Sequence, residues 1–288
     1  MAKSTDLEKA GVNFSRMLNT AVRLPLIRID RAEYLRSALK KHCTPAQIEA
    51  AVLTTPAHAG IPLEVIEKAA RSSIKYESTR VTGASAAAGL PGGVAAFITA
   101  PGDVVQFLGH VIRIAQKLAY LYSWPDLFTR DGEIDESTEG VLTLFIGIMY
   151  GVHVARGGVA KLAEMLAKNV VATLPNKALT NGVVYPIVKR VAASIGLTMT
   201  KRGFANGIAK AIPIAGAVVS GGLSLAAFLP MSKRLQKHLA SYEHARPADP
   251  AAADGPAEVV EWEEAYATDV EVAHFEWEDA EEVDAHEH

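Results

Sequence analysis

The sequence is poor in the residues and motifs that mark most enzymes. Its 288 residues include one cysteine, Cys43, which excludes a disulfide framework and favours a reducing compartment. It has no GxxxxGKS/T phosphate loop, GxGxxG, HExxH, CxxC or GxSxG motif. No secretory signal is recognisable. We therefore expect a cytoplasmic protein, or one at the cytoplasmic face of the inner membrane, and we predict no catalytic residue, cofactor or metal.

Aromatic residues are also scarce, at 7% of the chain, and alternating β-branched patterns are few. An alanine-rich composition of this kind predicts an all-α, multi-helix bundle with glycine- and alanine-rich apolar helices. The length is sufficient for one large core. We expect an N-terminal segment over residues 1–29 with a loosely held helix, a helical domain over 30–243, and a disordered acidic tail over 244–288.

The net charge of −3 hides a division between body and tail. Residues 244–288 contain 15 acidic residues and one Arg, a net of −14, which leaves 28 basic and 17 acidic residues before them, a net of +11. A body of this charge is expected to be drawn to anionic lipid, and a tethered acidic tail is expected to compete. Composition predicts a disordered tail. The alternative is a docking segment that uses Trp262, Phe275 and Trp277.

We expect the chain to be organised around residues 81–122. This stretch opens with 22 uncharged residues, 81–102, and continues as an apolar helix whose polar residues are spaced 3, 4, 3 and 4 apart. That spacing forms one narrow polar stripe, which predicts a central helix packed on most sides. The stripe could be a proton-handling or anion-binding groove, or only the wet edge of a buried helix. Its members are Asp103, Gln106, His110, Arg113 and Lys117.

Small residues in two uncharged runs predict close helix packing. The glycine-rich turn 89–93 is expected beside a cleft lined by Gln106, His110 and Arg113. The second run, 211–232, has small residues at every fourth position and is long enough to span a bilayer. A large helical domain can also bury such a run, so insertion and a peripheral or soluble fold both stay open. The packing candidates are Gly89, Gly92, Gly93, Gly216, Ser220 and Ser224.

Several helix starts carry capping signals. Asp30 with Glu33 resembles a capping pair, and Thr44 with Gln47 forms a capping box. The acidic run 131–139 alternates like a calcium loop but lacks the required Gly at its sixth position and Glu at its twelfth. We therefore expect these acids to cap the next helix, and the short early helices to form an N-terminal cap on the body.

The next apolar helix is predicted over 140–155, interrupted afterwards by Gly157-Gly158, and it contains His153. If it packs against the stripe, His110 and His153 could form a two-histidine metal site, although lone histidines are more often satisfied core residues. Cys43 lies beside His42, where nearby positive charge could lower its pKa. Adjacent residues on a helix do not face each other, so a catalytic pair is not expected there.

Several distinctive strings occur in order along the chain: AGI (59–61), GLPGG (89–93), QKLAYLY (116–122) before Trp124-Pro125, YPIVK (185–189) and IPIAGAVVSGGLSLAAF (212–228). Together they are similar to the EcsC family of bacterial helical proteins, and the resemblance covers roughly residues 30–240. The family has no agreed catalytic residues. Its name derives from a gene beside an ABC exporter, so the resemblance implies, at most, membrane-associated or accessory work. The acidic tail is not part of that pattern.

Two functional hypotheses remain. The first is a non-enzymatic, membrane-associated protein, accessory to a membrane process, whose basic and apolar body is restrained by the acidic tail. The second is a soluble helical enzyme or ligand-binding protein that uses the stripe around His110. The expected partner is a membrane surface or membrane protein, with anionic lipid as a candidate and no nucleic acid. The sequence leaves a homo-oligomer open.

Overall fold

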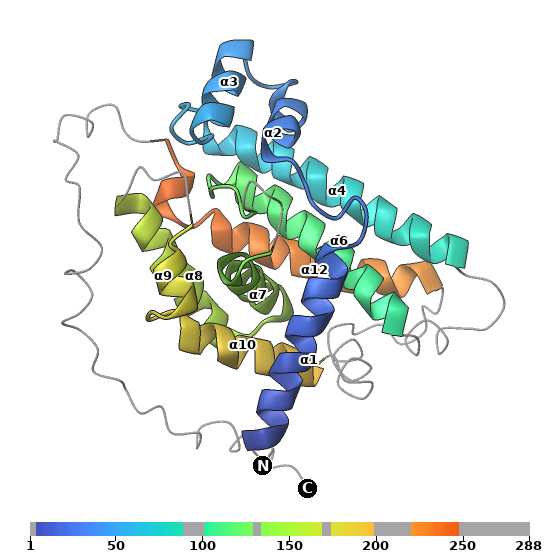
Figure 1. Ribbon diagram of the computed structural model, residues 1–288. Coiled ribbons are helices and arrows are strands. Elements are labelled where there is room, and N and C mark those ends of the chain that lie inside the picture. The colour runs from blue at the N-terminus through green and yellow to red at the C-terminus, as the bar shows by residue number, and fades with distance from the viewer. Residues whose placement is uncertain (1–3, 89–100, 129–133, 169–173, 199–219, 248–288) are drawn as a thin grey trace, which may run out of the picture. The chain divides into compact units, whose positions relative to one another are not determined.

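A computed structural model describes residues 4–88, 101–128, 134–168, 174–198 and 220–247 (Figure 1). All regular structure in these ranges is helical, which confirms the predicted all-α class. The chain divides into the units Met1–Asp254 and Gly255–His288, and every described residue belongs to the first. The helices are α1 (Ser4–Val22), α2 (Arg31–Leu39), α3 (Pro45–Leu53), α4 (Leu63–Ala88), α6 (Pro101–Leu121), α7 (Glu136–Tyr150), α8 (His153–Lys168), α9 (Asn176–Thr180), α10 (Tyr185–Thr198), α12 (Ser220–Leu239) and the 3₁₀ helix η1 (Glu243–Ala245).

Helix α7 is enclosed by α1, α6, α8, α9, α10 and α12, and Figure 1 shows it end-on among them. All its residues from 140 to 149 are buried, which confirms the prediction of a buried apolar helix here. The helix ends earlier than expected, at Tyr150. Gly151 adopts a left-handed conformation (φ 82°), and its N–H bonds back to the carbonyls of Gly147 and Ile148. His153 therefore starts α8 and is exposed.

The predicted interruption at Gly157-Gly158 is wrong, because α8 runs through both residues. A Cβ on Gly158 would lie 2.8 Å from Cδ2 of Leu144, so this glycine permits α8 to approach α7 closely. On α7, a Cβ on Gly147 would lie 2.5 Å from Cγ1 of Val191 in α10. The glycines here serve close packing between helices.

The first helix is also more firmly placed than the sequence suggested. Phe14, Leu18 and Ala21 of α1 are completely buried, so the expectation of a loosely held helix is wrong. A Cβ on Gly196 of α10 would overlap the carbonyl oxygen of Ala10, which means that the two backbones meet. The apolar residues of α1 recur at helical spacing, but nothing in α1 alone indicated the surface that covers them.

The predicted helix caps are present. Asp30 accepts a hydrogen bond from the N–H of Glu33 at 2.7 Å, and Thr44 forms a complete capping box with Gln47. Asp135 accepts from the N–H of Thr138 at 2.7 Å, which confirms that the acidic run caps the following helix. These bonds satisfy donors that a helix start leaves without partners.

Helix α6 contacts α1, α2, α4, α7 and α12, so the prediction that it is packed on most sides is confirmed. Over residues 108–125 only His110 and Arg113 are not fully buried. Helix α4 lies against α6 and α12 and continues to Ala88. The polar stripe of α6 therefore meets another long helix.

The two uncharged runs are only partly described. Residues 89–100 and 211–219 lie outside the described ranges, as do the side chains of Ser220 and Ser224, so the predicted roles of Gly89, Gly92, Gly93 and Gly216 stay predictions. Helix α12, which carries the end of the second run, contacts α4, α6 and α7. Within the described ranges, no helix combines the length and apolar character that crossing a membrane requires.

Candidate functional site

The polar stripe of α6 runs from an exposed end into the interior. Gln106 is exposed, whereas the side chains of His110, Arg113 and Lys117 are only 14%, 11% and 8% exposed. Asp103 lies in the first turn of α6, and its side chain is outside the described part. The three basic side chains of the stripe thus enter the protein side by side, and they need a counter-charge there.

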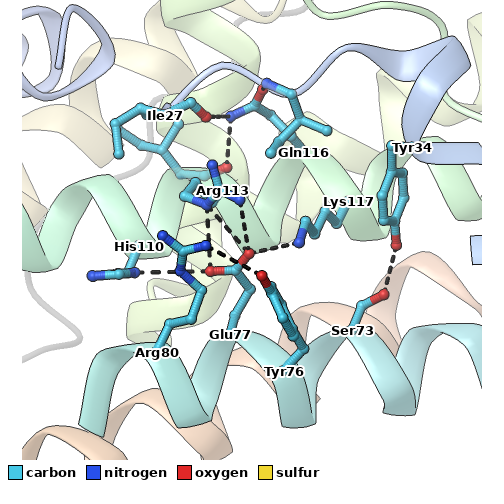
Figure 2. A network of polar contacts seen from close by, with 12 residues as sticks. Ile27, Tyr34, Ser73, Tyr76, Glu77, Arg80, His110, Arg113, Gln116 and Lys117 are labelled. Carbon is cyan, nitrogen blue, oxygen red and sulfur yellow. Dashed lines mark hydrogen bonds and ion pairs between the residues drawn. The ribbon is translucent and has the colours of Figure 1, made fainter. Parts of the chain in front are cut away.

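Glu77 of α4 supplies that counter-charge (Figure 2). Its carboxylate is completely buried and accepts a hydrogen bond from Nζ of Lys117 at 2.6 Å. Arg113 reaches the same oxygen with Nε and Nη2, both at 3.2 Å. Nδ1 of His110 lies 3.8 Å from the other oxygen, close enough for an ion pair when the ring is protonated but too far for a direct hydrogen bond.

The surrounding side chains keep Glu77 ionised. Burial alone would raise the pKa of its carboxyl group, but His110, Lys117 and Arg113 outweigh that effect and lower the pKa to about 2. A carboxylate of this pKa is a very weak base at neutral pH. Since one negative charge faces a lysine and an arginine, the cluster carries excess positive charge.

Aromatic rings of α2 and α4 support the cluster. Nζ of Lys117 lies 4.8 Å from the ring centroid of Tyr76 and 5.5 Å from that of Tyr34. Such contacts stabilise a cation that has lost much of its water. The hydroxyl of Tyr34 is hydrogen-bonded to Ser73 at 2.7 Å, and Arg80 donates from Nη1 to the hydroxyl of Tyr76 at 3.2 Å. Arg80 therefore stands beside the cluster as a further, exposed cation.

The loop 23–28, between α1 and α2, forms one wall of the site. Buried Gln116 holds it, donating to the carbonyl of Ile27 at 3.0 Å and accepting from the N–H of Ile29 at 2.9 Å. Ile27 packs onto Gly109, where a Cβ would lie 2.8 Å from its Cδ1. Leu26 has left-handed backbone (φ 65°), and its side chain is 75% exposed.

Between this loop and the helices lies a groove of about 690 Å³. It contains Gln106, His110 and Arg113 together, so the stripe does not simply face bulk solvent. Among the lining residues that the structure describes, none is acidic. One part of the lining is apolar and the other is cationic or polar. The lining residues are Thr20, Leu24, Pro25, Leu26, Ile27, Arg80, Val105, Gln106, His110 and Arg113.

Glu77, Arg80 and Gln116 are the functional candidates that sequence reasoning missed. A signal for Glu77 was available, since it occupies the same helix face as Ile66, Ala70 and Val81 and is an acid on an otherwise apolar face. No comparable signal existed for Gln116. Its role depends on a loop 87 residues earlier in the chain.

Two alternatives that the sequence left open, a two-histidine metal site and an activated Cys43, do not form in the described part of the chain. His153 is exposed at the start of α8 and does not lie on a buried helix facing His110. Within the described ranges, no group of three or more potential metal ligands occurs. Burial raises the pKa of Cys43, so its thiol is not activated by the neighbouring positive charges.

Comparison with protein-family models, with curated proteins and with solved structures finds no match to this chain. The resemblance to the EcsC family therefore stays a prediction.

Proposed function

We propose that this chain is a non-enzymatic protein that associates peripherally with a membrane surface through the loop 23–28. The observation that carries the proposal is Leu26, a leucine held 75% exposed in left-handed backbone. That conformation costs about 1–2 kcal/mol for a residue with a Cβ. Most of the leucine side chain remains in water in the folded chain. A partner that buries Leu26 would provide one.

The surroundings of Leu26 fit an anionic bilayer. Exposed Arg23 and Arg28 flank the loop, and Arg80 lines the adjoining groove. An apolar tip can enter the boundary between head groups and acyl chains while nearby arginines approach lipid phosphates. Because Gln116 hydrogen-bonds to the backbone of Ile27 and of Ile29, the tip of the loop is presented in a defined position.

The non-enzymatic part of the proposal is supported by the chemistry of the cluster. Glu77 is ionised, hydrogen-bonded to two cations and a very weak base, so it is poorly suited to general acid–base work. The resemblance to the EcsC family also favours accessory work at the cytoplasmic face of a membrane. A soluble ligand-binding protein is the second candidate, and the groove beside His110 is the observation that favours it.

Vesicle sedimentation with Leu26→Asn tests the membrane proposal. Asparagine tolerates left-handed backbone, so the thermal midpoint should not fall. Binding to vesicles containing phosphatidylglycerol should weaken about tenfold, because a leucine side chain is no longer buried in the interface. The matched control is Leu53→Asn, which removes a leucine that is 80% exposed at the end of α3. Equal binding by the wild type and Leu26→Asn, or no preference of the wild type for anionic over neutral vesicles, would overturn the proposal.

We further propose that the acidic tail restrains this binding. The support is the charge division, a body of +11 joined to a tail of −14. The first residues of the predicted tail pack on the body, since His244 lies edge-on to Trp124 at 5.4 Å and Ala245 is buried. A truncation should therefore fall after Pro247, so that these contacts remain.

The shortened chain should bind anionic vesicles several-fold more tightly than the full chain at low salt. Added salt should narrow the difference, because it screens attraction to the lipid and to the tail alike. Equal vesicle binding by the full and shortened chains at low salt would contradict the proposal that the tail restrains membrane binding. It would leave the tail without a role in membrane binding.

A further inference from the structure

The groove beside the loop 23–28 has a charge imbalance that an external anion would correct. In the cluster that adjoins the groove, Arg80, Arg113 and Lys117 bring three positive charges, and among the side chains that the structure describes there Glu77 is the one acid. These four described groups alone leave an excess of +2. Arg113 and Lys117 are nearly buried, so water compensates little of their charge. A solvent-exposed helix face with no role beyond folding would not need more cations than its one carboxylate can pair with.

The cations are also fixed in position before any ligand arrives. Nε and Nη2 of Arg113 are held by Glu77, and Arg113 also lines the groove. Arg80 comes from the neighbouring helix and is tied to Tyr76, as Figure 2 shows. Donors held in this way lose little side-chain entropy when they bind an anion. Guanidinium groups are the side chains best matched to a multi-oxygen anion.

We propose that this groove binds a phosphate monoester. Such a group has three acceptor oxygens and about −1.5 to −2 charge at pH 7, which balances the excess of +2. A carboxylate would leave about half of that excess in place. Arg80, Arg113 and His110 would contact the phosphate, and the exposed amide of Gln106 lies at the open end of the same groove.

The rest of the lining indicates what the phosphate is attached to. Leu24, Leu26, Ile27 and Val105 form an apolar portion of the groove beside its cationic portion. A volume of about 690 Å³ is within the range of small-molecule sites. The ligand is therefore a phosphate monoester carrying a short apolar or glycerol-like group. Two sources offer this chemistry, a lipid with a terminal phosphate such as phosphatidic acid and a soluble phosphate ester.

Only the first of these sources depends on the proposed membrane role. In that case Leu26 would enter the bilayer next to the head group whose phosphate lies in the groove. The phosphate site itself stands on the charge and geometry of the α4–α6 cluster. The two proposals can therefore fail separately.

The experiment compares vesicles with phosphatidic acid and vesicles with phosphatidylglycerol at matched surface charge, and titrates glycerol 3-phosphate in calorimetry. The variants are Arg80→Gln, which removes an exposed cation of the groove, and Gln106→Glu, which adds an acid to a lining whose described residues include none. The control is Lys75→Gln, an exposed cation of α4 that lines a separate hollow against α12. All three changes are at exposed positions, and thermal midpoints check that the fold is retained.

The expected result is tighter binding to phosphatidic acid than to phosphatidylglycerol. Arg80→Gln and Gln106→Glu should each reduce the preference about tenfold, the effect of one charged hydrogen bond, and Lys75→Gln should leave it unchanged. A second result would also support the site: glycerol 3-phosphate binds, Arg80→Gln and Gln106→Glu weaken that binding, and the protein shows no preference between the two kinds of vesicle. The ligand would then be a soluble phosphate ester. Equal binding to both lipids, no uptake of glycerol 3-phosphate and identical behaviour of Arg80→Gln and Lys75→Gln would overturn the inference. Leu26→Asn on phosphatidylglycerol would still report on the membrane role.

Discussion

Helices α6 and α7 contact each other and are both largely buried, yet they are held in the protein by opposite means. From residue 140 to 149, α7 is uncharged and buried, and it fits its neighbours by shape. Helix α6 sends Arg113 and Lys117 inward to a single buried acid. Apolar packing is the usual source of stability, whereas a buried ionic cluster is often replaceable by apolar residues without loss. This contrast supports the proposal that side chains of α6 serve binding.

The largest expected effect comes from breaking the charge cluster at its centre. Glu77→Gln leaves Lys117 and Arg113 buried without their counter-charge, and we expect a loss of about 3–5 kcal/mol in the free energy of unfolding. Urea denaturation measures this loss. The triple variant Glu77→Leu, Arg113→Leu and Lys117→Met should recover most of that stability while failing to bind glycerol 3-phosphate. If the urea midpoint of Glu77→Gln equalled that of the wild type, Glu77 would not be the buried counter-charge of Lys117 and Arg113.

The next effect is the pH dependence of stability. The pKa of Glu77 is about 2 in the folded protein against a reference value of 4.5, so the folded state binds this proton less readily than the unfolded state. Its contribution is complete above pH 4.5 and is lost as the pH falls towards 2, with a total of about 3 kcal/mol.

Glu77→Gln cannot titrate at this position, so it provides the matched measurement. The difference in unfolding free energy between the wild type and Glu77→Gln should shrink as the pH is lowered from 4.5 to 2. A difference that stays constant over this window would mean that folding does not lower the pKa of Glu77. The buried residues of α7 from 140 to 149 carry no charge, so they should not contribute to this pH dependence of the unfolding free energy.

A smaller effect is expected on the apolar side of the comparison. Gly147→Ala places a methyl group 2.5 Å from Cγ1 of Val191 and 2.8 Å from Cβ of Ala155, so it should cost about 1–3 kcal/mol by overpacking. Gly157→Ala in α8 meets nothing within 4 Å and should stabilise by about 0.5–1 kcal/mol, as alanine does in helices. Thermal denaturation distinguishes the two signs. Equal effects would mean that α7 is less tightly enclosed than the structure shows.

Part of the candidate site followed from spacing alone. His110, Arg113 and Lys117 share a helix face because 3, 4 and 7 residues return the chain to the same side of a helix. Which surface that face meets is a different matter. Glu77 lies 36 residues from Arg113 and 40 from Lys117, and its pairing with them depends on how α4 is rotated against α6.

The same dependence on neighbouring helices explains why the predicted boundaries of α7 and α8 were wrong. Gly151 and Gly158 are both glycines near the end of an apolar stretch, but one ends α7 with φ 82° and the other lies inside α8 against Leu144. A glycine permits either a left-handed turn or a close approach, and only its neighbours in space select between them. Gln116 likewise looks like one more residue of a buried helix until it meets the loop at Ile27.

By itself, the sequence determined the all-α class, the helix caps at Asp30, Thr44 and Asp135, the polar stripe of α6 and the separation of charge between body and tail. These properties depend on residues within a few turns of one another, or on composition. The tertiary structure alone decided that Glu77 is the counter-charge, that Leu26 is held outward beside the groove, and that α1 is anchored on α10. Those outcomes depend on the rotation and crossing of helices distant in the chain, which local periodicity leaves undetermined because each helix can turn its face to several neighbours.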